Sequence, residues 1–122
     1  DIQVEVLRPK TSILGAPVND IESSKDVRER VIASRQIQHH RAGKPNALLT
    51  NSELASFCQI EGETLQLLEL ASQQLYLSPR ACHRILKVSR TIADLDESGS
   101  INSEHVAEAI SFRRLNTDQH YI

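Results

Sequence analysis

The sequence has no Trp and no Met, and only two Phe, two Tyr and two Cys among its 122 residues. With so few aromatic side chains, its hydrophobic core has to be built from Leu, Ile, Val and Ala. Two cysteines do not make a disulfide framework, so we expect Cys58 and Cys82 to be reduced thiols of a cytoplasmic protein, buried as small apolar groups. No apolar run approaches the roughly 20 residues of a membrane span, so no membrane partner is expected. The formal charge of −2 gives no general attraction to nucleic acid.

The chain also lacks an initiator Met and a signal peptide. Ile2, Val4 and Val6 alternate with polar residues as in a β-strand, and Pro9 ends that pattern. The residues that follow, up to position 22, contain Pro and Gly but no periodicity, which predicts a linker. We therefore expect a fragment of a larger protein. In it, residues 1–22 would be the end of a core strand plus a linker, disordered because a lone strand has no pairing partner.

Helix signals dominate residues 23–115. Caps and breaks predict helices over about 24–41, 51–58, 61–75, 79–94 and 103–113, followed by a loose tail over 116–122. The start signals are a cap at Ser23 or Ser24, the capping-box pair Thr50 and Glu53, the pair Ser78 and Pro79, and a cap at Asn102. Two apolar faces are predicted, Val27, Val31 and Ile37 on the first helix and Leu65, Leu68, Ala71 and Leu75 on the third. The predicted fold is all-α, a small bundle of four to five helices with an N-terminal strand stub and linker.

Charge is segregated along the chain. Residues 45–77 carry four Glu and no Lys or Arg, whereas residues 78–93 carry four Lys or Arg and no acid. At roughly 100° per residue, the cations of the fourth predicted helix fall within about a third of its circumference, with no acid pairing at four-residue spacing. A solvated face normally mixes both signs, so this basic stripe predicts an anionic partner. The members of the basic stripe are Arg80, His83, Arg84, Lys87 and Arg90.

Arg80 lies in the first turn of that helix, where the helix dipole disfavours a cation. This position is easier to explain if an anion docks there, because free N–H groups at a helix start and an adjacent Arg suit a phosphate. The alternative is an ordinary solvated face, and the helix by itself leaves both interpretations open.

Residues 77–95 (LSPRACHRILKVSRTIADL) resemble the C-terminal domain of magnesium-chelatase-related AAA+ ATPases, in particular the ComM-like competence proteins. Residues 1–6 resemble the last core strand of that family. The resemblance implies the helical lid of a ring-forming ATPase, in which a sensor 2 arginine reaches the nucleotide phosphates. Arg80 stands at the matching helix start, and Arg84 is the weaker candidate. Four flanking segments also resemble the family: 27–31 (VRERV), 43–47 (GKPNA), 107–110 (AEAI) and 113–114 (RR).

The resemblance also implies cofactors and partners for the parent protein. These are ATP and Mg, the AAA+ core of the same chain, neighbouring subunits of a homo-oligomeric, hexameric ring, and DNA. ComM-like rings are DNA branch-migration motors of natural transformation, whereas the magnesium-chelatase relatives drive metal insertion into a porphyrin. No G-x-x-x-x-G-K-[ST] loop occurs in this chain, so we expect it to have no catalytic residue, to bind no cofactor alone and not to hydrolyse ATP. The remaining alternative is a free-standing helical interaction module whose basic face binds an acidic partner or DNA.

A rival signal is a calcium-binding loop. Asp94, Asp96 and Gly99 match the first half of an EF-hand loop and lie between two predicted helices. Loop position 12 requires a bidentate Glu, but it is His105, and Glu104 lies one residue early, about 100° around the helix. The spacing therefore favours a helix–turn–helix corner with Gly99 in the turn. The cysteines and histidines show no zinc-binding spacing either, and nothing supports a Ser-His-Asp or Cys-His site, so no metal is expected.

Overall fold

The computed structural model describes Ile2 and residues 23–119, with side chains up to Arg113. This described part contains five α-helices and one short 3-10 helix, and it has no β-strand. The predicted all-α bundle is confirmed, while the predicted strand and linker over residues 1–22 lie outside the described residues apart from Ile2. The elements are α1 (Ser24–Ala42), η3 (Asn46–Leu48), α2 (Asn51–Phe57), α3 (Gly62–Gln74), α4 (Pro79–Leu95) and α5 (Ser103–Gln119).

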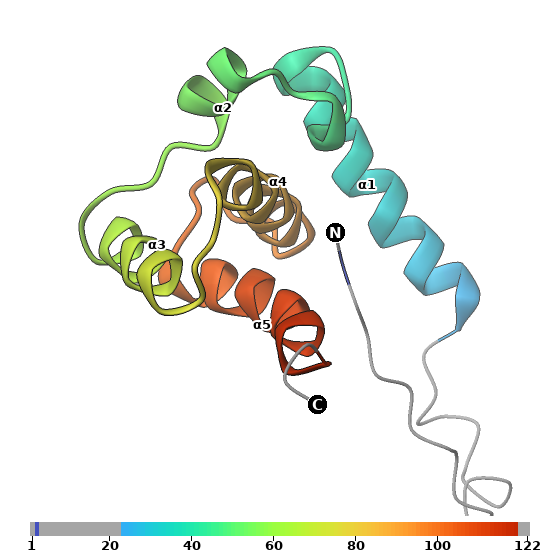
Figure 1. Ribbon diagram of the computed structural model, residues 1–122. Coiled ribbons are helices and arrows are strands. Elements are labelled where there is room, and N and C mark those ends of the chain that lie inside the picture. Colours follow the sequence, from blue (N-terminus) through green and yellow to red (C-terminus); the bar gives the residue numbers. More distant parts are fainter. Residues whose placement is uncertain (1, 3–22, 120–122) are drawn as a thin grey trace, which may run out of the picture.

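Helix α4 lies at the centre of the domain (Figure 1). Helices α1, α2 and α5 and the short η3 all pack against it, and α3 completes the bundle by packing on α5. In the view of Figure 1, α1 and α3 lie on opposite sides of α4. None of the described helices combines the length and the apolar character needed to cross a bilayer.

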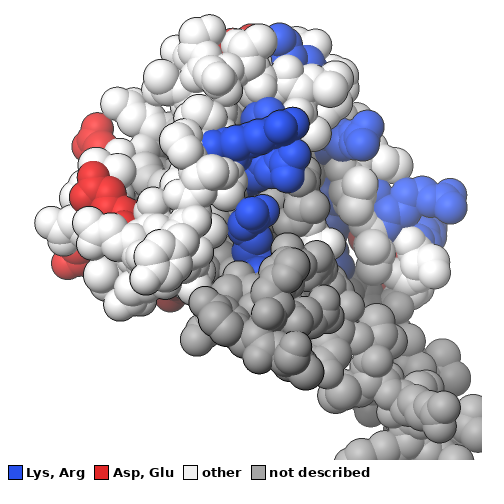
Figure 2. All heavy atoms as spheres, in the orientation of Figure 1, with Lys and Arg blue, Asp and Glu red and all other residues white. Residues whose placement is uncertain are grey.

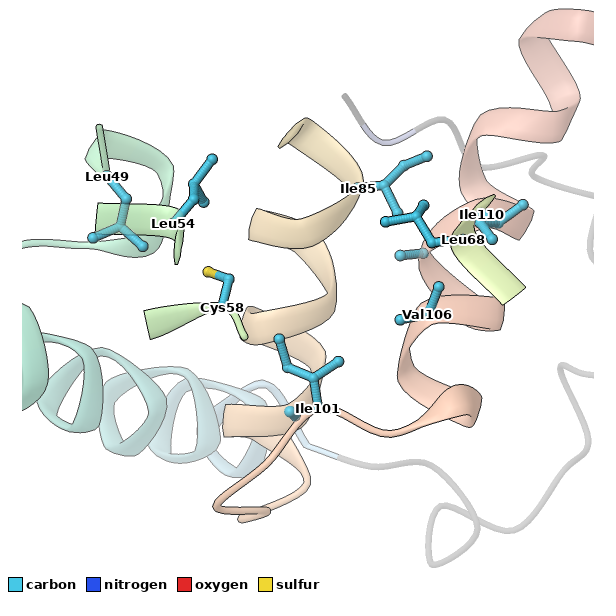
Figure 3. Close-up of a cluster of buried hydrophobic side chains, with 10 residues drawn as sticks. Leu49, Leu54, Cys58, Leu68, Ile85, Ile101, Val106 and Ile110 are labelled. Carbon is cyan, nitrogen blue, oxygen red and sulfur yellow. The ribbon is translucent and has the colours of Figure 1, made fainter. Parts of the chain in front are cut away.

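The core is aliphatic, as the composition predicts. Ile85 of α4, Leu68 of α3, and Val106 and Ile110 of α5 are buried in one cluster that continues to Cys58 at the end of α2 (Figure 3). Removing this apolar surface from water is the main stabilising contribution to the fold. It also fixes α4 against its neighbours on one side, while the other side, which carries Arg84 and Lys87, is only partly covered.

The two thiols differ in their surroundings. Cys58 is buried, as predicted, and burial raises the pKa of its thiol from 9.0 to about 11. Cys82 is only partly buried, although the helical period placed it on the apolar side of α4. The Cys58 thiol is therefore an unreactive core group at neutral pH.

The predicted helix starts are confirmed. Ser78 Oγ accepts a hydrogen bond from the Ala81 N–H at 3.1 Å, and Pro79 occupies the first helical position of α4. Thr50 and Glu53 form the reciprocal capping box of α2. These caps satisfy backbone donors that a helix start otherwise leaves without an intrahelical partner, which is why short polar residues mark the starts.

Several sequence predictions need correction. Helix α5 continues to Gln119, beyond the predicted end at 113. Val27 and Val31 of α1 are 41% and 45% exposed, because the positions of α1 that are buried are the polar Ser34 and Gln38. Ile37 and Leu65 are likewise about 40% exposed rather than part of a buried face. The prediction of the inner face of α1 from apolar periodicity was therefore wrong. That face is polar, and its Gln38 accepts a hydrogen bond from the Asn46 N–H.

Helices α3 and α4 both end in a left-handed turn made by a residue other than glycine. Tyr76 has φ 52° and Glu97 has φ 56°. The N–H of the residue after each donates to a carbonyl five residues earlier, Leu77 to Ser72 at 3.0 Å and Ser98 to Ala93 at 2.8 Å. This is the Schellman arrangement, in which glycine usually occupies the left-handed position because side chains are strained there.

Candidate functional site

A groove of about 1420 Å³ runs along the partly exposed side of α4. Its two walls differ in charge, because the cationic side chains come from α4 and the acidic ones from the following turn and α5. Apolar side chains of α4, among them Val88 and Ile92, line it between the charged groups. An anion would therefore lie against α4. The α4 wall contains Arg80, His83, Arg84 and Lys87, and the acidic side contains Asp96, Glu104 and Glu108.

Arg80 stands at the N-terminal end of this groove. Its side chain is exposed, and its guanidinium has no hydrogen-bond or ion-pair partner among the residues that the structure describes. Fewer free backbone N–H groups lie near Arg80 than the sequence suggested. The Ala81 N–H already donates to Ser78 Oγ, and Pro79 has no N–H. Recognition of an anion at this end would thus depend mainly on the Arg80 side chain.

The other cations of the groove are more constrained than Arg80. Lys87 Nζ donates a hydrogen bond to the carbonyl oxygen of Ala47 at 3.3 Å, which ties it to η3. Arg84 and His83 are partly buried. The structure therefore brings Arg80 and Arg84 to the same groove, where Arg80 is exposed and Arg84 is partly buried.

Arg90 does not belong to the exposed stripe, and its placement there was wrong. It is only 4% exposed, and its Nε donates to Asp94 Oδ1 at 3.2 Å, four residues on in the same helix. Its two terminal nitrogens donate to the carbonyls of Ser98 at 2.8 Å and Gly99 at 3.3 Å. The prediction that no acid pairs with the stripe at four-residue spacing was also wrong. Burial lowers the pKa of Arg90, and the neighbouring Asp94 carboxylate opposes that shift.

Asp94 is the centre of a buried polar cluster that joins three elements. Its side chain is fully buried and accepts hydrogen bonds from Arg41 of α1, from Arg90, and from Asn46 Nδ2 at 3.0 Å. The backbone N–H of Asn46 in turn donates to Gln38 Oε1 at 3.0 Å. We call Arg41, Asn46, Arg90 and Asp94 the Asp94 cluster. It fixes α1 and η3 on α4, and thereby the wall to which Lys87 is bonded.

The first residues of the calcium-like loop are used in ion pairs and hydrogen bonds within the domain. Asp94, which would be the first calcium ligand, faces two guanidinium groups, and Asp96 accepts a hydrogen bond from His105 Nε2 at 3.0 Å. His105 Nδ1 accepts from the Asn102 N–H at 3.0 Å, so both ring nitrogens have partners. The segment is a helix–turn–helix corner whose left-handed residue is Glu97, not Gly99. Within the described part of the chain, no three His, Cys, Asp or Glu side chains are grouped to hold a metal ion.

Comparisons with known proteins identify the family of this sequence. Residues 21–113 match the family described as magnesium chelatase, subunit ChlI C-terminal. The chain is 44% identical over 116 residues to the competence protein ComM of Haemophilus influenzae. It is also 43% identical over 115 residues to the uncharacterized protein YifB of Escherichia coli. In both cases the match covers 94% of this chain but 23% of the relative, so the chain spans about a quarter of the length of these curated relatives.

Proposed function

Because this chain belongs to the magnesium chelatase subunit ChlI C-terminal family, we propose that it works as the helical lid of an AAA+ ATPase and contacts the nucleotide phosphates through Arg80. The observation that carries the proposal is the unpaired, exposed guanidinium of Arg80, among the described residues, at the end of a groove whose α4 wall is cationic. A guanidinium presents several donors in a fixed plane, which suits phosphate oxygens.

ATP and Mg²⁺ are the proposed cofactors of the parent protein. The groove fits a triphosphate in charge and size, since cations line one wall and the volume is ample. Arg80 would hold the phosphates, with Arg84 and Lys87 adding positive potential beside them. Bound Mg²⁺ would supply further neutralisation of phosphate charge. The acids Glu104 and Glu108 repel phosphate and restrict it to the α4 side.

The test is an Arg80→Gln substitution in the full-length protein, with ATP turnover as the measurement. A hydrogen bond to a charged group contributes about 1.5–3 kcal/mol, so turnover should fall roughly 10- to 150-fold. Arg80→Lys should recover part of the loss, because it keeps the charge but not the planar donors. Lys25→Gln, which removes an exposed cation of α1 away from the groove, is the matched control and should leave turnover unchanged.

Unchanged turnover in a folded Arg80→Gln protein would refute the assignment of Arg80 as the phosphate sensor. Circular dichroism shows whether the variant keeps its helices. Because Arg80 is exposed and forms no bond with the described residues, its loss should not affect the fold.

The similarity to known proteins also suggests what the parent ATPase does with the energy of ATP. The 44% identity to a competence protein favours a DNA branch-migration motor of a ring-forming type, in which the lid moves with the nucleotide state. The family description favours the alternative, an ATPase subunit that drives magnesium insertion into a porphyrin. ATP-dependent displacement of strands from a four-way DNA junction would support the first role. ATP-dependent magnesium insertion without junction activity would support the second.

A further inference from the structure

Two of the described histidines line the groove along α4, and they differ in their hydrogen bonding. His105 of α5 is 4% exposed, and its Nδ1 and Nε2 bond to the Asn102 N–H and to Asp96 Oδ2, both at 3.0 Å. His83 of α4 is partly buried, and its ring has no hydrogen-bond or ion-pair partner among the residues that the structure describes. Of the two, only His83 can therefore bind a ligand in the groove without breaking an existing hydrogen bond.

His83 stands between two cations of the α4 wall. It follows Arg80 by three residues and precedes Lys87 by four, and side chains at these spacings are neighbours on the surface of a helix. In Figure 2, Lys and Arg side chains gather near the middle of the face in view, where α4 lies in Figure 1, and Asp and Glu side chains lie at its edge. A phosphate chain that extends from Arg80 towards Lys87 would pass the imidazole of His83.

A proton on the His83 ring is repelled by this wall while the groove is empty, because the other charged side chains of the wall are cations. The acids of the groove belong to the opposite side, and η3 and α2 contribute only the uncharged Ala47 and Asn51. A bound phosphate reverses the balance, because it places negative charge beside the ring. The cations of the wall are Arg80, Arg84 and Lys87, the acids opposite are Asp96, Glu104 and Glu108, and the other histidine is His105.

We propose that His83 is a second phosphate-binding residue of the groove, and that its imidazole takes up a proton from solvent when the nucleotide binds. The charged ring donates a strong hydrogen bond to a phosphate oxygen, and no covalent bond forms. This inference rests on the proposed role of the groove in nucleotide sensing. It makes nucleotide binding tighter at about pH 6 than at about pH 8, because histidine changes its charge in this range and only the charged ring attracts phosphate.

The experiment uses the full-length protein and the slowly hydrolysed analogue ATPγS with excess Mg²⁺. Calorimetric titrations near neutral pH, in two buffers that differ in ionisation enthalpy, give the number of protons taken up on binding. The wild type should take up about half a proton or more, and its affinity should fall roughly tenfold from about pH 6 to about pH 8. His83→Gln keeps a neutral hydrogen-bonding group. It should lose this uptake and most of the pH dependence, with an affinity close to that of the wild type at the higher pH.

The matched control is His40→Gln, which removes an exposed histidine of α1 outside the groove and should keep the wild-type proton uptake. Circular dichroism verifies that each variant folds. Equal proton uptake by the wild type and His83→Gln would overturn the proposal, as would wild-type binding that does not depend on pH.

Arg80→Gln separates this inference from the proposed function. If Arg80→Gln weakens ATPγS binding while His83→Gln leaves proton uptake and pH dependence unchanged, the role of His83 is refuted and that of Arg80 is supported. If neither substitution changes binding, the nucleotide does not meet this groove and both proposals are refuted.

Discussion

Replacing Asp94 by asparagine removes one negative charge from the interior while keeping the size of the side chain. Asp94 is 2% exposed and faces the guanidinium groups of Arg41 and Arg90, whose side chains are 21% and 5% exposed. In the variant these cations remain buried or partly buried without a counter-ion, and the new amide N–H₂ adds a donor where only donors approach. We therefore expect a large loss of stability.

The magnitude follows from the burial of the pair. Breaking a buried ion pair by removing one partner costs about 3–5 kcal/mol, because the remaining charge is uncompensated. A domain of this size has a free energy of unfolding on the order of 5–15 kcal/mol. One substitution should thus remove about a fifth of the total or more. At 4–8 °C for each kcal/mol, the melting temperature should fall by roughly 12 °C or more.

Thermal melting and urea unfolding, followed by far-UV circular dichroism, measure this loss. The matched control is Asp96→Asn, which removes the same charge two residues away. There the side chain is 68% exposed and its partner among the described residues is His105, so the change in stability should stay within about 1 kcal/mol. If Asp94→Asn melted as close to the wild type as Asp96→Asn does, the Asp94 cluster would not be what holds α1 and η3 on α4.

Two further predictions concern local conformation and pH. Tyr76→Gly should raise the free energy of unfolding by about 0.5–1 kcal/mol in urea titrations, since glycine relieves the left-handed strain at φ 52° at some cost in chain entropy; a lower value would mean that Tyr76 makes compensating contacts. The hydrogen bond from Lys44 lowers the pKa of Glu53 from 4.5 to about 2. The resulting stabilisation is present above pH 4.5 and is lost as the pH falls through 2. The wild type should accordingly exceed Glu53→Gln in stability at pH 7, with the difference closing between those pH values; a difference independent of pH would exclude the charge as its cause.

The helix starts could be predicted because their signals are local. Ser78 with Pro79, and Thr50 with Glu53, each act on backbone groups within four residues, so the sequence contains both partners of the interaction. The same holds for Asn102, whose side chain accepts the N–H groups of the next helix. Local spacing is enough to recognise a cap, and it also placed Arg80 correctly at the start of α4.

The inner face of α1 could not be predicted in this way. Helical periodicity scores apolar residues, and therefore chose Val27 and Val31, whereas Gln38 is buried because Asn46 of η3 supplies a partner for its side chain. Arg90 was misplaced for a related reason. The helical period places Arg90 beside Lys87. The carbonyl that accepts its hydrogen bond at Ser98 belongs to the turn after α4, whose conformation cannot be read from helical periodicity. Arg41, which shares Asp94 with Arg90, is 53 residues away from Asp94 in the sequence.

The way α1 is attached has a mechanical consequence. Its C-terminal half is fixed by Gln38 and Arg41, whereas every residue from Ser24 to Ala33 is exposed. Gln38 and Arg41 thus hold α1 near its C-terminal end, and Arg41 of the Asp94 cluster lies 17 residues, or about 25 Å, from Ser24. A tilt of 10° about Arg41 would displace the first turn by roughly 4 Å, because displacement grows with distance along a rigid helix. A small change in how α1 packs on α4 would therefore displace the first turn of α1 more than the Asp94 cluster.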